Sequence, residues 1–261
     1  MQYVRHSFGI DLSESKRARL QIEMANLLAA SDCTSLSEFL AELDAGGEHH
    51  EALANIVTTN VTSFFREAHH FELLEETVIP KLKQKAQQGD RIRVWSAGCS
   101  SGQEPYSIAM TFLKAWPELV RFDVKLLATD LDKAVLSKAE LGRYSTGAFE
   151  EIPQRYQGFW QARDGSVEAT SQMKSFMRFR RLNLMDAWPF SGRFDVVFCR
   201  NVAIYFSQSV RDRLWRRISD VVEPDGYLFV GHSERVANNE EAGFQPCGVT
   251  CYQKTTNHTH D

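Results

Sequence analysis

The chain has 261 residues, of which 43% are hydrophobic and 25% are charged, a composition typical of soluble globular proteins. The length suits one large domain or two smaller ones, and no apolar run approaches the roughly 18 residues that a membrane span requires. The formal net charge of −4 argues against a nucleic-acid-binding enzyme, because such proteins usually present a basic surface. The first residues contain no apolar segment typical of a secretory signal, so we expect a cytoplasmic protein.

The N-terminal part of the chain has the apolar spacing that is typical of helices. Start signals at Ser13 and Ser35 and a stop at Gly46-Gly47 divide this part into three helices. A fourth helix then leads through a polar stretch into the next domain. We therefore expect an all-helical N-terminal domain with its linker over residues 1–84. Its expected elements are helices from 13, from 35 or 37, and around 53–57, then a helix over 71–82 and a linker over 83–90.

From Arg91 onward the pattern changes to strands that alternate with helices. This alternation predicts an α/β domain over residues 85–261, with a mostly parallel sheet and helices on both of its faces. Ligands of such sheets bind at the carboxyl ends of the strands. The expected strands are 92–95, 124–128, 176–180, 195–199 and 227–230, with a closing hairpin from 245–246 and 249–253, and the expected helices are 104–116, 133–141 and 210–221.

The turn after the first of these strands is rich in small residues. Gly98 and Gly102 allow a tight bend and the close approach of a ligand, although an ordinary tight turn is the alternative. The spacing is not GxGxxG, and no Lys-Ser or Lys-Thr pair follows, which excludes a P-loop. Glu104 would repel a pyrophosphate and favours a ligand that carries positive charge.

The second strand ends at Asp130, which can accept hydrogen bonds from both hydroxyls of a ribose. The alternative is that Asp130 caps the helix that follows. The glycine-containing turn and the acidic strand end together favour a nucleoside ligand. Because Glu104 adds a preference for positive charge, S-adenosylmethionine satisfies both requirements.

Six sequence motifs keep the order and spacing found in one known family. The chain resembles the CheR family, the chemotaxis-receptor protein-glutamate O-methyltransferases, over nearly its whole length. The resemblance implies a Rossmann-like methyltransferase domain, a small helical N-terminal domain and a small antiparallel β subdomain inserted at about 145–180. The motifs are TTNVTSFFRE (58–67), VWSAGCSSGQEPYSIAM (94–110), ATDLDKAVLSKA (128–139), RLNLMD (181–186), FDVVFCRNVAIYF (194–206) and PDGYLFVGHSE (224–234).

The resemblance also implies the site residues. Arg66 and Tyr205 become the catalytic candidates, with Tyr205 near the transferred methyl group. The alternatives are an interdomain ion pair for Arg66 and a buried, backbone-bonded hydroxyl for Tyr205. Phe64, Phe65 and Phe206 of the same motifs are expected in the core. The expected cofactor-binding residues are Asn60, Thr62, Arg66, Gly98, Glu104, Asp130, Asn183, Leu184, Asn201 and Val202.

The implied reaction moves a methyl group from S-adenosylmethionine to glutamate side chains on the cytoplasmic helices of membrane chemoreceptors. The products are glutamate methyl esters and S-adenosylhomocysteine. Two alternatives stay open: the same chemistry on a receptor of a non-swimming pathway, such as surface attachment or pili, and a regulatory module that binds the cofactor without turnover.

The chain departs from the family pattern in ways that bear on its partners. Positive charges crowd at Lys16, Arg17 and Arg19, which indicates either a thin receptor-docking patch or a solvated helix start. The loop over residues 161–176 holds a single glycine, Gly165, so we expect no binding of a C-terminal receptor tether. We further expect a monomer that binds neither nucleic acid nor metal.

Cysteines and histidines show no pattern of a metal site. The five cysteines form no CxxC pair and are expected to be reduced and mostly buried. His49-His50, His69-His70, His258 and His260 lack an acidic partner at ligand spacing, and we expect them to be solvated.

Overall fold

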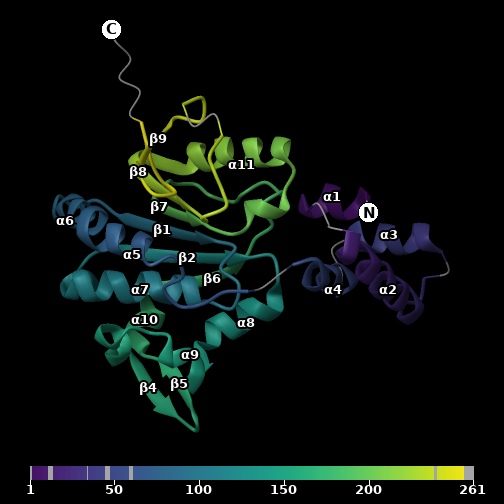
Figure 1. Ribbon diagram of the computed structural model, residues 1–261, viewed down its shortest axis with the longest axis horizontal. Helices are drawn as coiled ribbons and strands as arrows, with labels where there is room; N and C mark the ends of the chain where they lie inside the picture. Colours follow the sequence, from purple (N-terminus) through teal and green to yellow (C-terminus); the bar gives the residue numbers. More distant parts are fainter. Residues whose placement is uncertain are drawn as a thin grey trace.

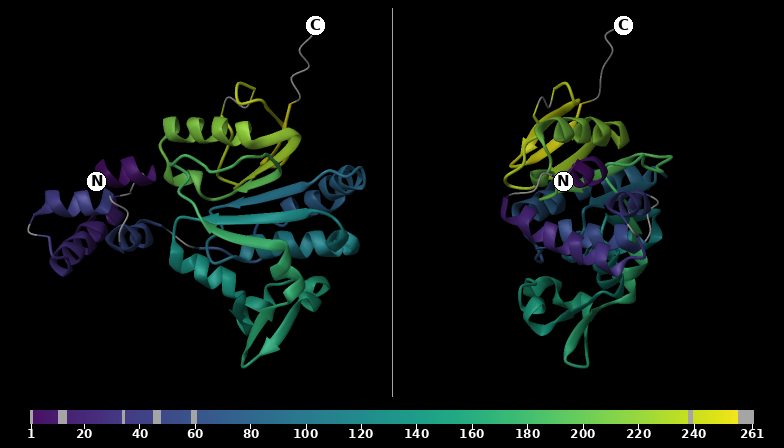
Figure 2. Two further views of the ribbon diagram at one scale, coloured as in Figure 1. Left: turned by 180° about the vertical axis from the view of Figure 1, so that it is seen from behind. Right: turned by 90° about the vertical axis from the view of Figure 1, so that its right-hand side faces the viewer.

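The computed structural model describes residues 2–10, 14–33, 35–44, 48–58, 61–237 and 240–255. A bundle of helices from the start of the chain stands at one end of a central sheet, and a small second sheet projects from the side (Figures 1 and 2). None of the described helices is long and apolar enough to cross a bilayer.

The N-terminal bundle is built from α1 (Gln2–Phe8), α2 (Glu14–Ala30), α3 (Leu36–Asp44) and α4 (Glu48–Val57). The last three confirm predicted helices, whereas the expected start and stop signals at Ser13 and Gly46-Gly47 lie outside the described residues. Helix α1 was not predicted. Its buried residues Val4 and Phe8 are four positions apart and share one helix face, and Gly9 ends the helix in the left-handed region at φ +70°.

A nearly continuous helix follows, made of α5 (His69–Leu73), a π turn (Leu74–Val78) and α6 (Ile79–Gln87). The prediction of a polar linker over 83–90 is therefore wrong for residues 83–87, which are helical. Leu82 and Ala86 are 5% exposed and pack in the core beneath the sheet, which keeps this segment helical. The expected domain boundary at residue 84 stays a prediction.

The main sheet confirms the predicted α/β fold. Its strands run in the order β6-β2-β1-β7-β8-β10-β9, parallel from β6 to β8, while β10 is antiparallel to both neighbours. The strands are β1 (Ile92–Ala97), β2 (Val124–Asp130), β6 (Met177–Arg181), β7 (Phe194–Cys199), β8 (Val222–Val230), β9 (Phe244–Gly248) and β10 (Cys251–Lys254).

Helices cover both faces of this sheet, with α7 (Gln103–Ala115) and α11 (Gln208–Val221) on opposite sides in Figure 1. Successive side chains of β1 pack into the hydrophobic cores on opposite faces of the sheet, because side chains alternate across a strand. Val94 packs in the core that contains α7, and Trp95 packs in the core that contains α11. Helix α8 (Lys133–Leu141) follows β2.

The inserted subdomain is a three-stranded antiparallel sheet in the order β3-β5-β4, which confirms the predicted antiparallel insert. Its expected span of about 145–180 stays a prediction, and Met177–Arg181 at the end of that span is strand β6 of the main sheet. The rings of Tyr156 and Trp160 are buried in the core that also contains α7, so the insert is anchored to the main domain. Its elements are β3 (Arg143–Ser145), α9 (Thr146–Glu150), β4 (Trp160–Arg163), β5 (Ser166–Ala169) and α10 (Ser171–Phe176).

Candidate cofactor and methyl-transfer site

A pocket lies where β1, β2 and β7 end and the N-terminal bundle meets the sheet. Its empty volume, the open mouth included, is about 940 Å³. Nine of the ten predicted cofactor-binding residues line this pocket, as does Tyr205, while Asn60 lies outside the described residues.

Gly98 shapes the pocket wall at the end of β1. Its φ of +79° is in the left-handed region, and an added Cβ would lie 2.3 Å from Cγ2 of Val202. Glycine is therefore needed here to bring the β1 turn against the loop that follows β7. Gly102 does not line the pocket. Glycine is needed there for packing, because an added Cβ would clash with Ala139 and Tyr144.

Asp130 is the last residue of β2 and is 7% exposed. Its Oδ2 accepts a 2.7 Å hydrogen bond from the Ser100 amide, and its Oδ1 accepts one of 3.0 Å from the amide of Asp132. Burial raises the pKa of Asp130, while the two amides lower it. The alternative that Asp130 caps α8 is wrong, since Asp132 caps that helix through the amides of Ala134 and Val135.

Glu104 is held by an arginine that the sequence reasoning missed. Arg200 donates through Nη1 to Glu104 Oε2 at 3.1 Å, and Ser96 donates to Oε1 at 2.7 Å. The other end of Arg200 lies 3.3 Å from Glu67 Oε2. Two carboxylates and one guanidinium leave a net charge of −1 when all three are ionised. Glu67 does not line the pocket, however, and the pocket wall itself carries two guanidinium groups, of Arg66 and Arg200, against two carboxylates, of Glu104 and Asp130. The preference for a cationic ligand that Glu104 indicated is therefore offset by Arg200. The cluster of Glu67, Glu104 and Arg200 is hereafter called the charged triad.

Arg66 presents a guanidinium at the pocket wall. Its Nη1 donates to the carbonyl of Val61 at 3.1 Å, and no carboxylate among the described residues lies within ion-pair distance. The interdomain ion pair considered for Arg66 thus finds no partner in the described part of the chain.

The N-terminal segment closes one side of the pocket. Phe8 and Ile10 line it, and Ile10 forms an isolated antiparallel bridge with Phe206. The side-chain amide of Asn183 donates to the carbonyl of Ser7 at 2.8 Å. Sequence reasoning missed this wall because it missed α1; the spacing of Val4 and Phe8, with Gly9 after them, was the available signal.

Comparison with known proteins decides the family. The model described as "CheR methyltransferase, SAM binding domain" matches residues 60–252. The chain belongs to the CheR methyltransferase family. Its cofactor is S-adenosylmethionine. The chain is 38% identical to a probable chemotaxis protein methyltransferase of Rhizobium etli (95% of each chain covered) and 37% identical to chemotaxis protein methyltransferases of Borreliella burgdorferi (92% of this chain, 88% of the relative) and Pseudomonas aeruginosa (90% and 88%).

The pocket of this CheR-family chain fits that cofactor. Gly98 leaves the β1 turn without a side chain, Asp130 stands at the strand end where a ribose would be bound, and the Glu104 carboxylate lies in the same wall. Leu184 and Phe8 add apolar wall that suits a flat base.

The loop after β7 in this CheR-family chain is held in place by Glu234, a second residue whose role was not predicted from the sequence. This carboxylate is 2% exposed and accepts hydrogen bonds from four backbone amides. Its Oε2 accepts from Gly231 at 2.6 Å and Asn201 at 2.8 Å, and its Oε1 accepts from Val202 at 3.0 Å and Ile204 at 3.2 Å. Glu234 thereby holds Asn201 at its left-handed φ of +59° and keeps Asn201 and Val202 in the pocket wall.

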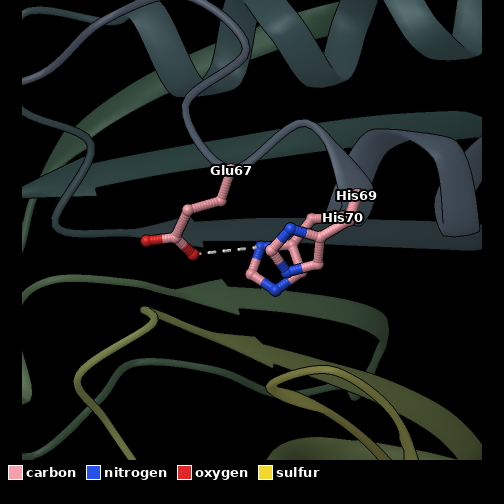
Figure 3. Close-up of side chains that lie close together, drawn as sticks. All are labelled: Glu67, His69 and His70. Carbon is pink, nitrogen blue, oxygen red and sulfur yellow. Dashed lines mark ion pairs between the residues drawn. The ribbon is translucent and has the colours of Figure 1, made fainter.

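Glu67 of the charged triad also forms a tight cluster with His69 and His70 (Figure 3). His70 is fully buried, so the expectation of a solvated histidine is wrong for this residue. Burial, with help from Arg200, lowers the pKa of His70 to about 3. Although burial opposes it, Arg200 and His232 hold the pKa of Glu67 at about 2. The ligand atoms of the cluster lie within 4.8 Å of one another, but the guanidinium 3.3 Å from Glu67 opposes a metal cation.

The aromatic residues of the family motifs pack largely as expected. Phe64 is 5% exposed and meets Tyr144 and Trp160 edge to face. Phe65 is partly buried and stacks on Tyr156. Phe206 is buried but also contributes to the pocket wall.

Proposed function

We propose that this CheR-family enzyme methylates glutamate side chains on the cytoplasmic helices of chemoreceptors, with glutamate methyl esters and S-adenosylhomocysteine as products. Relatives that are named chemotaxis protein methyltransferases and share most of the chain support the proposal. The observation that supports a glutamate acceptor is that both carboxylates of the pocket wall already accept hydrogen bonds from the protein.

The usual general bases, a histidine or an unbonded carboxylate, are not offered by the described part of the pocket wall. The wall contains no histidine or lysine among the described residues, and its two carboxylates already accept hydrogen bonds. Glu104 is bound by Arg200 and Ser96, and Asp130 is bound by two backbone amides. An amine or alcohol acceptor would have to lose a proton, whereas a glutamate with a pKa of about 4.3 is already an anion at neutral pH. The site therefore favours a carboxylate acceptor.

When bound, S-adenosylmethionine supplies a methyl group on a positively charged sulfur and leaves as a neutral thioether. The protein then has to place an acceptor oxygen in line with that carbon, and positioning of this kind is worth ~7–11 kcal/mol. Arg66 can orient the incoming carboxylate through its guanidinium. Tyr205, on the short turn Ala203–Tyr205 at the pocket wall, is placed to hydrogen-bond the acceptor or face the cation with its ring.

The test is incubation of the purified protein with methyl-labelled S-adenosylmethionine and receptor-bearing membranes that lack their own methyltransferase. We expect label in the receptor that mild alkali releases as methanol, because esters are base-labile and methylated amines are not. The Arg66→Gln variant should lose most of this labelling. Arg163→Gln, which changes an exposed arginine of the inserted sheet, is the matched control and should keep it. Alkali-stable label, or equal labelling by Arg66→Gln and the wild type, would contradict the proposal.

A further inference from the structure

Two thiols that the methyl transfer does not use lie side by side at the far edge of the sheet. Cys247 is near the end of β9, and Cys251 begins β10 after a tight turn. All five cysteines of the chain are free, but only this pair brings its sulfurs together among the described contacts, with 3.2 Å between the Sγ atoms. Cys99 and Cys199 are buried elsewhere, which confirms that most of the thiols are enclosed.

The surroundings of the two thiols make them unequal. Cys247 is exposed, whereas Cys251 is fully buried. A hydrogen bond from Cys251 and the nearby Lys81 ammonium lower the pKa of Cys247. The same contact, together with burial, raises the pKa of Cys251. An exposed thiol of low pKa beside a second thiol is the arrangement of an attacking and a resolving cysteine.

We propose that Cys247 and Cys251 are a reversible dithiol site that is oxidised by exchange with small-molecule disulfides, such as glutathione disulfide. The thiolate of Cys247 attacks one sulfur of that disulfide, which forms a mixed disulfide and releases one glutathione thiolate. Cys251, losing its proton, then attacks the Cys247 sulfur and releases the second glutathione. The protein loses two electrons and two thiol protons, and one glutathione disulfide becomes two molecules of glutathione.

The turn between the two cysteines is linked to the pocket by successive side-chain contacts through His70, Glu67 and Arg200. His70 Nε2 lies 2.8 Å from the Thr250 hydroxyl and 3.2 Å from the Val249 carbonyl oxygen. His70 Nδ1 is 3.5 Å from Glu67, a member of the charged triad. Thr250 already has a left-handed φ of +50°. Oxidation brings the sulfurs from 3.2 Å to about 2.0 Å and so pulls on this turn. The dithiol site is therefore coupled to cofactor binding through His70 and Glu67.

The experiment equilibrates the full-length protein in buffers of varied glutathione and glutathione disulfide, followed by alkylation and peptide mass mapping. We expect an internal Cys247–Cys251 bond in the wild type. Cys251→Ala should instead accumulate glutathione on Cys247, and Cys247→Ser should accumulate neither product. Cys33→Ser is the matched control, because Cys33 is the other thiol that reaches solvent, and it should still form the bond.

Calorimetry with S-adenosylhomocysteine tests the coupling separately. The oxidised wild type should bind about fivefold more weakly than the reduced protein, at the low end of typical coupling between sites, and reduction should restore the affinity. Cys247→Ser should bind equally under both conditions. A stable glutathione adduct on the wild type would overturn the dithiol site. An internal bond with unchanged affinity would overturn the coupling. Normal binding by the reduced protein shows that the cofactor pocket itself is intact in either case.

Discussion

Replacement of Glu234 with glutamine changes a single buried group that holds the loop after β7. Each oxygen of this carboxylate accepts two backbone N–H groups, from Gly231 and Asn201 on one side and from Val202 and Ile204 on the other. The glutamine amide can accept on only one side. Whichever way it turns, its NH₂ group faces two N–H donors and leaves both without an acceptor.

The size of the effect follows from these four bonds. A hydrogen bond to a charged group is worth ~1.5–3 kcal/mol, so the loss of two costs about 3–6 kcal/mol. Burial raises the pKa of Glu234 against the pull of the amides, which shows that the ionised carboxylate carries a desolvation cost. The neutral amide avoids that cost, so we expect a net loss of about 3 kcal/mol in unfolding free energy. In a chain of this size that lowers the melting temperature by roughly 6–12 °C.

The Glu234→Gln change should also weaken the binding of the cofactor product by this loop. Asn201 and Val202 line the pocket, so we expect S-adenosylhomocysteine to bind about tenfold more weakly, equivalent to ~1.4 kcal/mol. Thermal unfolding and calorimetry measure the two effects on the same sample. Glu241→Gln, which changes an exposed glutamate of the same region, is the matched control and should alter neither. If Glu234→Gln melts earlier but binds S-adenosylhomocysteine normally, the carboxylate only stabilises the fold and does not position the pocket.

Four further changes test other parts of the site. Asp130→Ala should abolish measurable binding of S-adenosylhomocysteine in calorimetry, because the ribose loses its acceptor, and normal affinity would refute that assignment. Tyr205→Phe should lower kcat in the labelling assay with little change in cofactor affinity, and a loss of affinity instead would move Tyr205 to a binding role. Gly98→Ala should destabilise the protein by about 2 kcal/mol in urea unfolding, because the new methyl meets Val202 at a left-handed φ. Val202→Ala should recover part of this loss, and full stability of Gly98→Ala would show that the turn relaxes. His70 has a folded-state pKa of about 3, below the ordinary 6.5, so the unfolded chain alone takes up its proton and stability falls by ~1.4 kcal/mol per pH unit as the pH drops below 6.5. His70→Gln should flatten the decline in urea unfolding free energy between pH 6.5 and 5, and an unchanged slope would mean that His70 titrates normally.

The sequence alone determined the class of the fold and the position of the site. Strand and helix periods are local properties, so the alternation after Arg91 was sufficient to predict the parallel sheet and the edge where a ligand binds. Gly98 and Asp130 could be identified because each stands at the end of a strand, where the topology brings strand ends together. The prediction of a linker over 83–90 was wrong as far as Gln87 for the opposite reason, because only the burial of Ala86 in the core shows that the helix continues past Leu82.

Tertiary structure alone decided how the charges of the site are arranged. Arg200 lies 96 positions from Glu104 in the chain, and Glu234 lies 33 positions from Asn201. No local pattern reports which buried charges become neighbours. The free energy of a buried charge depends on those neighbours, since a carboxylate away from water is tolerated only where cations or amides surround it. The sequence could therefore show that Glu104 faces the pocket, but only the folded chain shows that Arg200 already shares its charge.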